Sequence, residues 1–295
     1  MHPNETGSVV RIVSPQPLRV RIGWEDIRKR FSLYVGGVMV VFVLLGALFA
    51  PFFTPYSPIQ QNYSAVLQGV SMAHWLGTDN LGRDTFTRLL FGARTSMEVT
   101  IGSALLGVVV GVPIGLLSGF YQGWFDDLIL MRIIDALQAF PFLILALVLA
   151  AMLGPGIRNA AIAIGIGYIP IFVRTVRGQV LKEKNKEYIE AARMTGCRSS
   201  RLMIVHLLPN IMTPLLVQIT LAIANGIVTE ASLGYLGLSA QPPTASWGSM
   251  LQVAQGYIST DPLMAIAPGL AIVFAVLGFN LLGDGLQSRL NKRQV

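Results

Sequence analysis

Charged side chains are scarce in this sequence. They make up 13% of the 295 residues, whereas soluble domains carry about 25%, and hydrophobic residues make up 53%. So few charges cannot cover the surface of a solvated domain of this size. The composition therefore excludes a small soluble domain and predicts a polytopic membrane protein.

Cysteine, histidine and the common catalytic motifs are also scarce or absent. Cys197 is the single cysteine, so an intramolecular disulfide is impossible, and we interpret it as a small buried residue. The three histidines are far apart and lack metal-ligand spacing. The chain has neither a G-x-x-x-x-G-K-[ST] phosphate loop nor a G-x-S-x-G nucleophile motif. We expect no catalysis, metal or cofactor here; any uphill transport is driven by an ion gradient or another subunit.

Apolar stretches of about 20 residues, the length that crosses a bilayer, recur along the chain. Backbone groups in lipid must be paired internally, so these stretches predict helices and an all-α fold with about six transmembrane helices. The second stretch is rich in glycine, which predicts a closely packed face. Each of the last five contains a proline that can kink it. The predicted spans are 34–53, 98–120, 128–153, 159–176, 211–234 and 264–284.

Lysine and arginine concentrate in alternate loops. Six lie in the N-terminal tail 1–33, eight in the stretch 174–201, and none in the loop 235–263. The positive-inside rule therefore predicts a cytoplasmic N-terminal tail, a cytoplasmic loop 177–210 and a cytoplasmic C-terminal tail 291–295 around a transmembrane domain 34–290. The region 54–97 and the loop 235–263 are then on the outside. Thirty mostly polar residues precede the first span, which we expect to be a retained anchor. Anionic lipid explains the net charge of +7 without nucleic acid.

The cytoplasmic loop predicts a helix–glycine–helix hairpin. Its segment 182–194 is amphipathic, and Gly196 suits a left-handed helix end. Ser199 or Ser200 is expected to cap the second helix, and Pro209 to begin the next span. An amphipathic helix lying on lipid is the alternative. The glycine turn and the central Glu190 favour a protein socket.

The same loop resembles the "EAA" loop of bacterial ABC importer permeases. Glu190-Ala191-Ala192, Gly196 and Leu208-Pro209 match its pattern, and a histidine at the place of His206 is familiar in peptide permeases. The resemblance implies a coupling helix that inserts into an ATPase subunit. The residues implied in coupling are Glu190, Ala191, Ala192, Gly196, His206 and Pro209.

Four further motifs are similar to the "C" type subunit of dipeptide, oligopeptide and nickel permeases over about residues 25–290. They lie at 77–96, 135–141, 236–248 and 279–286. The resemblance implies a type I ABC importer permease fold in the bacterial inner membrane. It implies as partners a homologous "B" type permease, two ABC ATPases that use ATP and Mg, and an extracytoplasmic solute-binding protein. Peptides are the expected solute, with nickel, glutathione or another small solute as alternatives. An ion-driven secondary transporter predicts an inverted repeat, which we do not find.

Polar residues in the spans are candidates for the solute path. Asp135 and Gln138 lie one turn apart; alternatively Asp135 pairs with Arg132 or Arg174. Asn225 and Glu230 lie in the fifth span, with Glu230 near the outer end, where water or a peptide ammonium can reach it.

The outer region supplies candidates for contact with the binding protein. The resemblance places Asp79, Arg83, Asp84 and Trp247 on the face that receives it. Alternatively, the charged residues of this region form a salt-linked structural cap with Arg88.

Overall fold

The structure, a computed structural model, describes residues 24–291. All regular secondary structure in this part of the chain is helical, apart from an isolated bridge between Thr78 and Asp84. Five helices are long and apolar enough to cross a membrane, or six spans if one bent pair counts as a span. They confirm the predicted all-α membrane fold. The five are α1 (Trp24–Leu48), α3 (Thr85–Tyr121), α6 (Ile157–Glu183), α9 (Leu208–Tyr235, continuous with the residues from Ser199) and α11 (Leu263–Asn291).

The predicted third span is not one straight helix. It consists of a π-helical turn η2 (Asp126–Leu130), α4 (Met131–Gln138) and α5 (Phe142–Leu153), and the two halves are bent by 91°. The break falls just before α5, whose N-cap is Pro141 in a non-helical conformation (φ −54°, ψ 131°). Proline disfavours a helical conformation in the residue before it, which explains the bend. The other span prolines lie inside continuous helices.

The glycine-rich face of α3 packs against α6, as predicted. A Cβ atom built on Gly111 would lie 2.7 Å from Phe172 Cβ, and one on Gly115 would lie 2.7 Å from the carbonyl oxygen of Val173. A Cβ at these positions would overlap α6, so glycine permits the close approach. The first and last helices approach similarly: a Cβ on Gly285 would lie 2.5 Å from Leu33 Cα.

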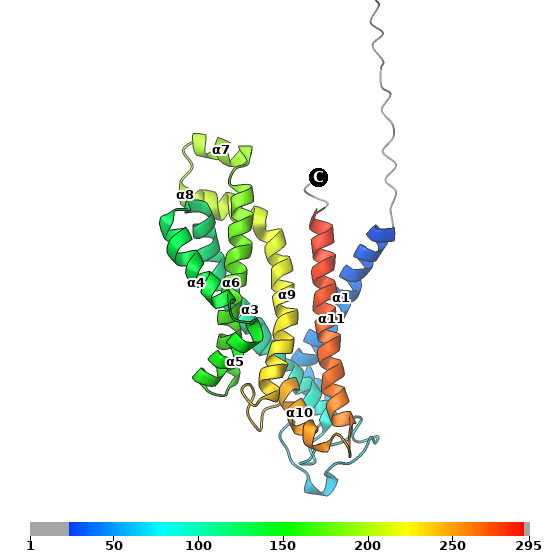
Figure 1. The fold of residues 1–295 in the computed structure, drawn as a ribbon. Helices are drawn as coiled ribbons and strands as arrows, with labels where there is room; N and C mark the ends of the chain where they lie inside the picture. The colour runs from blue at the N-terminus through cyan, green and yellow to red at the C-terminus, as the bar shows by residue number, and fades with distance from the viewer. Residues whose placement is uncertain (1–23, 292–295) are drawn as a thin grey trace, which may run out of the picture.

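The short elements gather at the two ends of the bundle (Figure 1). One end holds the start of α1, the end of α11 and a hairpin of α7 (Glu187–Met194) and α8 (Ser199–Arg201). The opposite end holds α10 (Trp247–Ala254) and the connection from α1 to α3. Of the predicted tails, residues 1–23 and 292–295 lie outside the described part. The remaining short elements are α2 (Ala50–Phe53), η1 (Tyr63–Ala65), η3 (Leu202–Leu207) and η4 (Gln255–Tyr257).

Candidate functional site

The predicted helix–glycine–helix hairpin is present. α7 ends at Met194, Gly196 has a φ of +80°, and α8 runs through the π-helical η3 into α9. The backbone N–H of Gly196 donates to Arg193 O (2.9 Å) and that of Cys197 to Ala192 O (3.1 Å), so the carbonyls at the end of α7 are paired. The serine-cap prediction is wrong. The N-cap of α8 is Arg198, and no side chain caps it.

The hairpin is packed on its own chain. Ile189 is fully buried and belongs to the same apolar core as Leu202 and Leu207. The guanidinium of Arg193 lies 5.4 Å from the centre of the Phe120 ring, near the end of α3. Apolar burial and this cation–π contact hold α7 against both its neighbours. These contacts join α7 to η3 and to the end of α3.

Glu183 fixes the angle between α6 and α7. Glu183 is buried, with 7% of its surface exposed. Its carboxylate accepts hydrogen bonds from Lys186 Nζ (2.7 Å) and from the Tyr188 hydroxyl (3.0 Å). Burial, followed by the hydrogen bond and the charge of Glu183, raises the pKa of Tyr188 to about 12, while the amide of Asn210 opposes this shift. The hydroxyl therefore remains a donor at neutral pH.

A second polar cluster joins α6 to α3 and η2. Arg177 donates to Asp126 Oδ2 (2.9 Å from Nη2), to Asp127 (3.1 Å) and to the Ser118 hydroxyl (3.0 Å). Ser118 also bonds Asp126. The sequence prediction missed this cluster. The signal was present in the two adjacent acids and the arginine, each at the end of a predicted span.

The residues predicted for coupling lie together along this hairpin and its continuation. Glu190, Ala191 and Gly196 are exposed, and Ala192 is partly buried. His206 lies in η3, partly buried, and Pro209 is exposed in the first turn of α9. The exposed face of α7 also presents Met194, which is 90% exposed. The hairpin thus exposes both acidic and apolar side chains that a partner protein can contact.

The residues predicted for the solute path lie on α4 and α9 and have different surroundings. Asp135 on α4 forms an ion pair with Arg174 on α6, one of the two basic partners considered from the sequence, and both side chains are about half exposed. Gln138 is partly buried, and Asn225 is exposed on α9. Glu230 is 0% exposed, and its Oε1 accepts from the Ser239 hydroxyl (2.9 Å). The expectation that Glu230 meets water or solute is therefore corrected for this conformation.

Family models match most of the chain. Residues 111–295 match the "Binding-protein-dependent transport system inner membrane component", and residues 20–69 match the "N-terminal TM domain of oligopeptide transport permease C". The chain belongs to the binding-protein-dependent transport permease family. The permease is a multi-pass inner-membrane protein and a transport subunit, and is not itself an ATPase.

Curated relatives resemble the permease over nearly its full length. It is 41% identical to the dipeptide transport system permease protein DppC of Alkalihalophilus pseudofirmus, covering 92% of this chain and 90% of that protein. It is 41% identical to the glutathione transport system permease protein GsiD of Pectobacterium atrosepticum (93% and 92%). It is 40% identical to the di/tripeptide transport system permease protein DppC of Pseudomonas aeruginosa (99% and 97%).

A solved structure supports the fold. The permease matches a chain of the inward-facing MetNI methionine ABC transporter with a TM-score of 0.58 and 20% identity, covering 70% of the permease and 96% of that chain. The fold is therefore that of an ABC importer transmembrane subunit.

The charged residues of the region predicted to lie outside, 54–97, form a buried cap. Asp79, Arg83 and Asp84 are at most 5% exposed. Asp79 Oδ2 lies 2.6 Å from Arg83 Nε and 3.4 Å from Arg88 Nε, and Asp84 bonds His74 (2.9 Å) and caps α3 at Thr87 N (2.7 Å). These side chains have no surface to offer a binding protein, so we correct that prediction. The alternative, a salt-linked structural cap, is confirmed.

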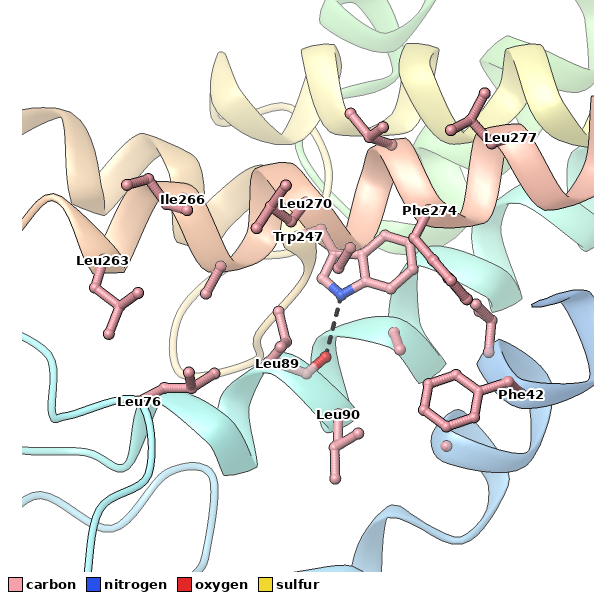
Figure 2. Close-up of a pocket in the computed structure, with 16 residues that line it drawn as sticks. Phe42, Leu76, Leu89, Leu90, Trp247, Leu263, Ile266, Leu270, Phe274 and Leu277 are labelled. Carbon is pink, nitrogen blue, oxygen red and sulfur yellow. Dashed lines mark hydrogen bonds between the residues drawn. The ribbon is translucent and has the colours of Figure 1, made fainter. Parts of the chain in front are cut away.

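Trp247, the fourth predicted contact residue, is also buried, at 2% exposed. Its indole N–H donates to Leu89 O (3.1 Å), and its ring forms part of the wall of an apolar pocket of about 540 Å³ between α1, α3 and α11 (Figure 2). Trp247 therefore anchors α10 to α3. The pocket is lined by Phe42, Val43, Gly46, Leu76, Leu89, Leu90, Ala93, Trp247, Leu263, Ile266, Ala267, Leu270, Ala271, Val273, Phe274 and Leu277.

Proposed function

We propose that the permease forms one half of the translocation path of an ATP-driven importer for short peptides. The observation that carries this proposal is the α7–Gly196–α8 hairpin, a rigid and exposed knob at one end of the membrane bundle. The relatives named above handle dipeptides, di/tripeptides or glutathione, which is itself a short peptide. Nickel is the less favoured solute, because the described residues contain no group of three or more possible metal ligands.

The proposed assembly has the hairpin and both termini in the cytoplasm. A homologous "B" type permease lines the other side of the path. Two ATPase subunits bind the cytoplasmic hairpins, one for each permease, and ATP and Mg bind to those subunits. A solute-binding protein delivers peptide to the outer end, where α10 and the buried charged cap lie.

The contacts of α7 support a mechanism for coupling. Closure of the ATPases on ATP moves the two hairpins together. The movement passes to α6 through Glu183 and to α3 through Arg193 and Phe120. Because Arg177 ties α6 to η2, the bent α4–α5 unit moves with it. The path then opens outward to receive peptide, and hydrolysis resets it.

Uptake measurements test this function. A strain lacking the permease would be complemented with the chain and its neighbouring subunits, and labelled di- and tripeptides, glutathione and nickel would be compared. We expect peptide uptake that stops when the ATPase is inactivated. Uptake of nickel alone would overturn the proposal that short peptides are the substrate. Uptake without a working ATPase would overturn the ABC mechanism.

Variants of the hairpin test the coupling residues. Glu190→Lys reverses an exposed charge, and Gly196→Arg places a side chain at φ +80°, where L residues are strained. Both should reach the membrane yet lose ATPase assembly or coupled hydrolysis. Gly256→Arg is the control, since Gly256 is exposed in η4, outside the candidate spans, and a Cβ there meets nothing within 4 Å. Normal coupling in both hairpin variants would refute the assignment.

A further inference from the structure

A basic hollow lies beside the tip of the hairpin. Its volume is about 670 Å³, which is enough for several side chains of a protein loop. No carboxylate is among its lining residues. They are Ala192, Thr195, Gly196, Cys197, Arg198, Ser200, Arg201 and His206.

The polar groups of the hollow are largely without partners. Within the part of the chain that the structure describes, the side chains of Arg198, Arg201, Ser200 and His206 make no hydrogen bond or ion pair. Arg198 and Arg201 are exposed. In contrast, Arg193 on the same hairpin lies over the Phe120 ring. Two cations and a hydroxyl donor thus surround one cavity with no counter-charge of their own, an arrangement that suits an anionic ligand.

We propose that this hollow receives a carboxylate-bearing segment of the ATPase subunit. The proposal rests on the proposed function, because it gives the chemistry of the partner at the same hairpin. The hollow shares Ala192 and Gly196 with the loop that is proposed to dock there, so the two surfaces are continuous. A phospholipid headgroup also carries an anion that arginine binds, and the comparison of zwitterionic with anionic nanodiscs below distinguishes it from the ATPase.

The charges on the two parts of the hairpin set the direction of docking. α7 exposes Glu187 and Glu190, and its one basic side chain, Arg193, lies over the Phe120 ring, whereas the hollow exposes Arg198 and Arg201. The ATPase surface therefore carries basic groups opposite α7 and acidic groups opposite the hollow. A reversed orientation would place like charges together, which is unfavourable. The pattern fixes one orientation of the ATPase and speeds its association at low salt.

Charge reversal tests the hollow. The full permease pair would be placed in zwitterionic nanodiscs, and binding of the purified ATPase subunits of the same transporter would be measured. We expect R198E/R201E to bind on the order of a hundredfold more weakly, because like charges then face each other. Replacing acidic residues of the ATPase by lysine should restore binding. R198K/R201K, which keeps the charge, should bind normally, as should R158E at the opposite end of α6.

The single cysteine supplies a test without substitution. Cys197 is partly exposed, which corrects the expectation of a buried residue, and it lines the hollow, so a sulfonated maleimide can report access to it. Docked ATPase should slow the labelling of Cys197 severalfold in the wild-type complex. Labelling that is equally fast with ATPase bound would overturn the proposal.

The outcomes separate the hollow from the proposed function. Normal ATPase binding by R198E/R201E, with binding lost in Glu190→Lys, would overturn the hollow as a docking site and leave the importer function standing. A defect that appears only with anionic lipid, and is absent in zwitterionic nanodiscs, would assign the hollow to lipid headgroups instead. A wild-type permease pair that binds no ATPase would overturn the proposed function itself.

Discussion

The Tyr188 hydroxyl donates a 3.0 Å hydrogen bond to Glu183 and so joins the first turn of α7 to the last residue of α6. The carboxylate also accepts from Lys186, so both of its oxygens are occupied by the turn that leads into α7. A helix can transmit a displacement to its neighbour only if it does not rotate freely relative to that neighbour. This hydrogen bond restrains the rotation of α7 about its connection to α6.

Tyr188→Phe should loosen that joint while keeping the ring in place. The loss of one hydrogen bond of about 1 kcal/mol corresponds to a factor of roughly five in the population of the coupled state. We expect peptide transported per ATP hydrolysed to fall by a factor of this order, with ATPase binding unchanged. The control is Tyr235→Phe, which has nearly the same exposure (39% against 38%) at the last residue of α9, the end opposite the hairpin. Equal coupling ratios in the two variants would contradict the role of Tyr188.

The pH dependence of this contact follows from the raised pKa. Tyr188 has a folded pKa of about 12 against an ordinary 10.0, so protonation is favoured in the folded state. Its contribution is complete below pH 10 and is lost as the pH rises through 12. We therefore expect Tyr188 to add no pH dependence to coupling between pH 6 and pH 8.5. The pH profile of coupling over this range should have the same shape in the wild type and in Tyr188→Phe.

The close α3–α6 approach predicts a steep cost for added volume. Gly115→Ala would place a Cβ 2.7 Å from Val173 O and 2.8 Å from Val176 Cβ, and overpacking of this kind costs about 1–3 kcal/mol. Gly102→Ala on the same helix meets only Ala161 Cβ at 4.0 Å. Thermal unfolding in detergent should show a lower Tm for the first variant and an unchanged or higher Tm for the second.

Composition and glycine spacing predicted the membrane fold and the α3–α6 contact, because both depend on local sequence. The extent of the helices was harder to predict. α3 begins at Thr85, whereas the predicted span begins at residue 98. The prediction stopped short because a hydropathy pattern treats an arginine as exposed, and the fold instead buries Arg88 and pairs it with Asp79. The burial of Asp79, Arg83 and Asp84 was missed for the same reason. Their partners come from the fold, so the sequence could not distinguish a contact surface from a cap.

Asp79 should be essential to that cap. Its carboxylate lies against two buried guanidinium groups, those of Arg83 and Arg88. Asp79→Ala leaves both without their counter-charge, and a broken buried pair costs about 3–5 kcal/mol. We expect a clear fall in Tm and in the amount of protein in the membrane. Glu98→Gln, an exposed change on α3, is the control and should leave both quantities unchanged.

Glu230 should not determine which peptides are carried. It is fully buried and bonded to Ser239, so its carboxylate stabilises the turn after α9. Glu230→Gln keeps the shape and an acceptor oxygen, and uptake of acidic, basic and neutral dipeptides should keep the wild-type ranking. A changed ranking would show that Glu230 becomes exposed in another conformation.

Asp135 is the membrane acid whose charge can be tested directly, because its partner is known. It pairs with Arg174 between α4 and α6, and both side chains are about half exposed, so the pair adds only about 0.2–1 kcal/mol to stability. Asp135→Asn should therefore express normally and transport less, because α4 loses its tie to α6. The reversed pair Asp135→Arg/Arg174→Asp should regain transport if the tie is what matters. Normal transport in Asp135→Asn would exclude any need for the charge. An inactive reversed pair, alongside an inactive Asp135→Asn, would instead place the carboxylate itself on the solute path.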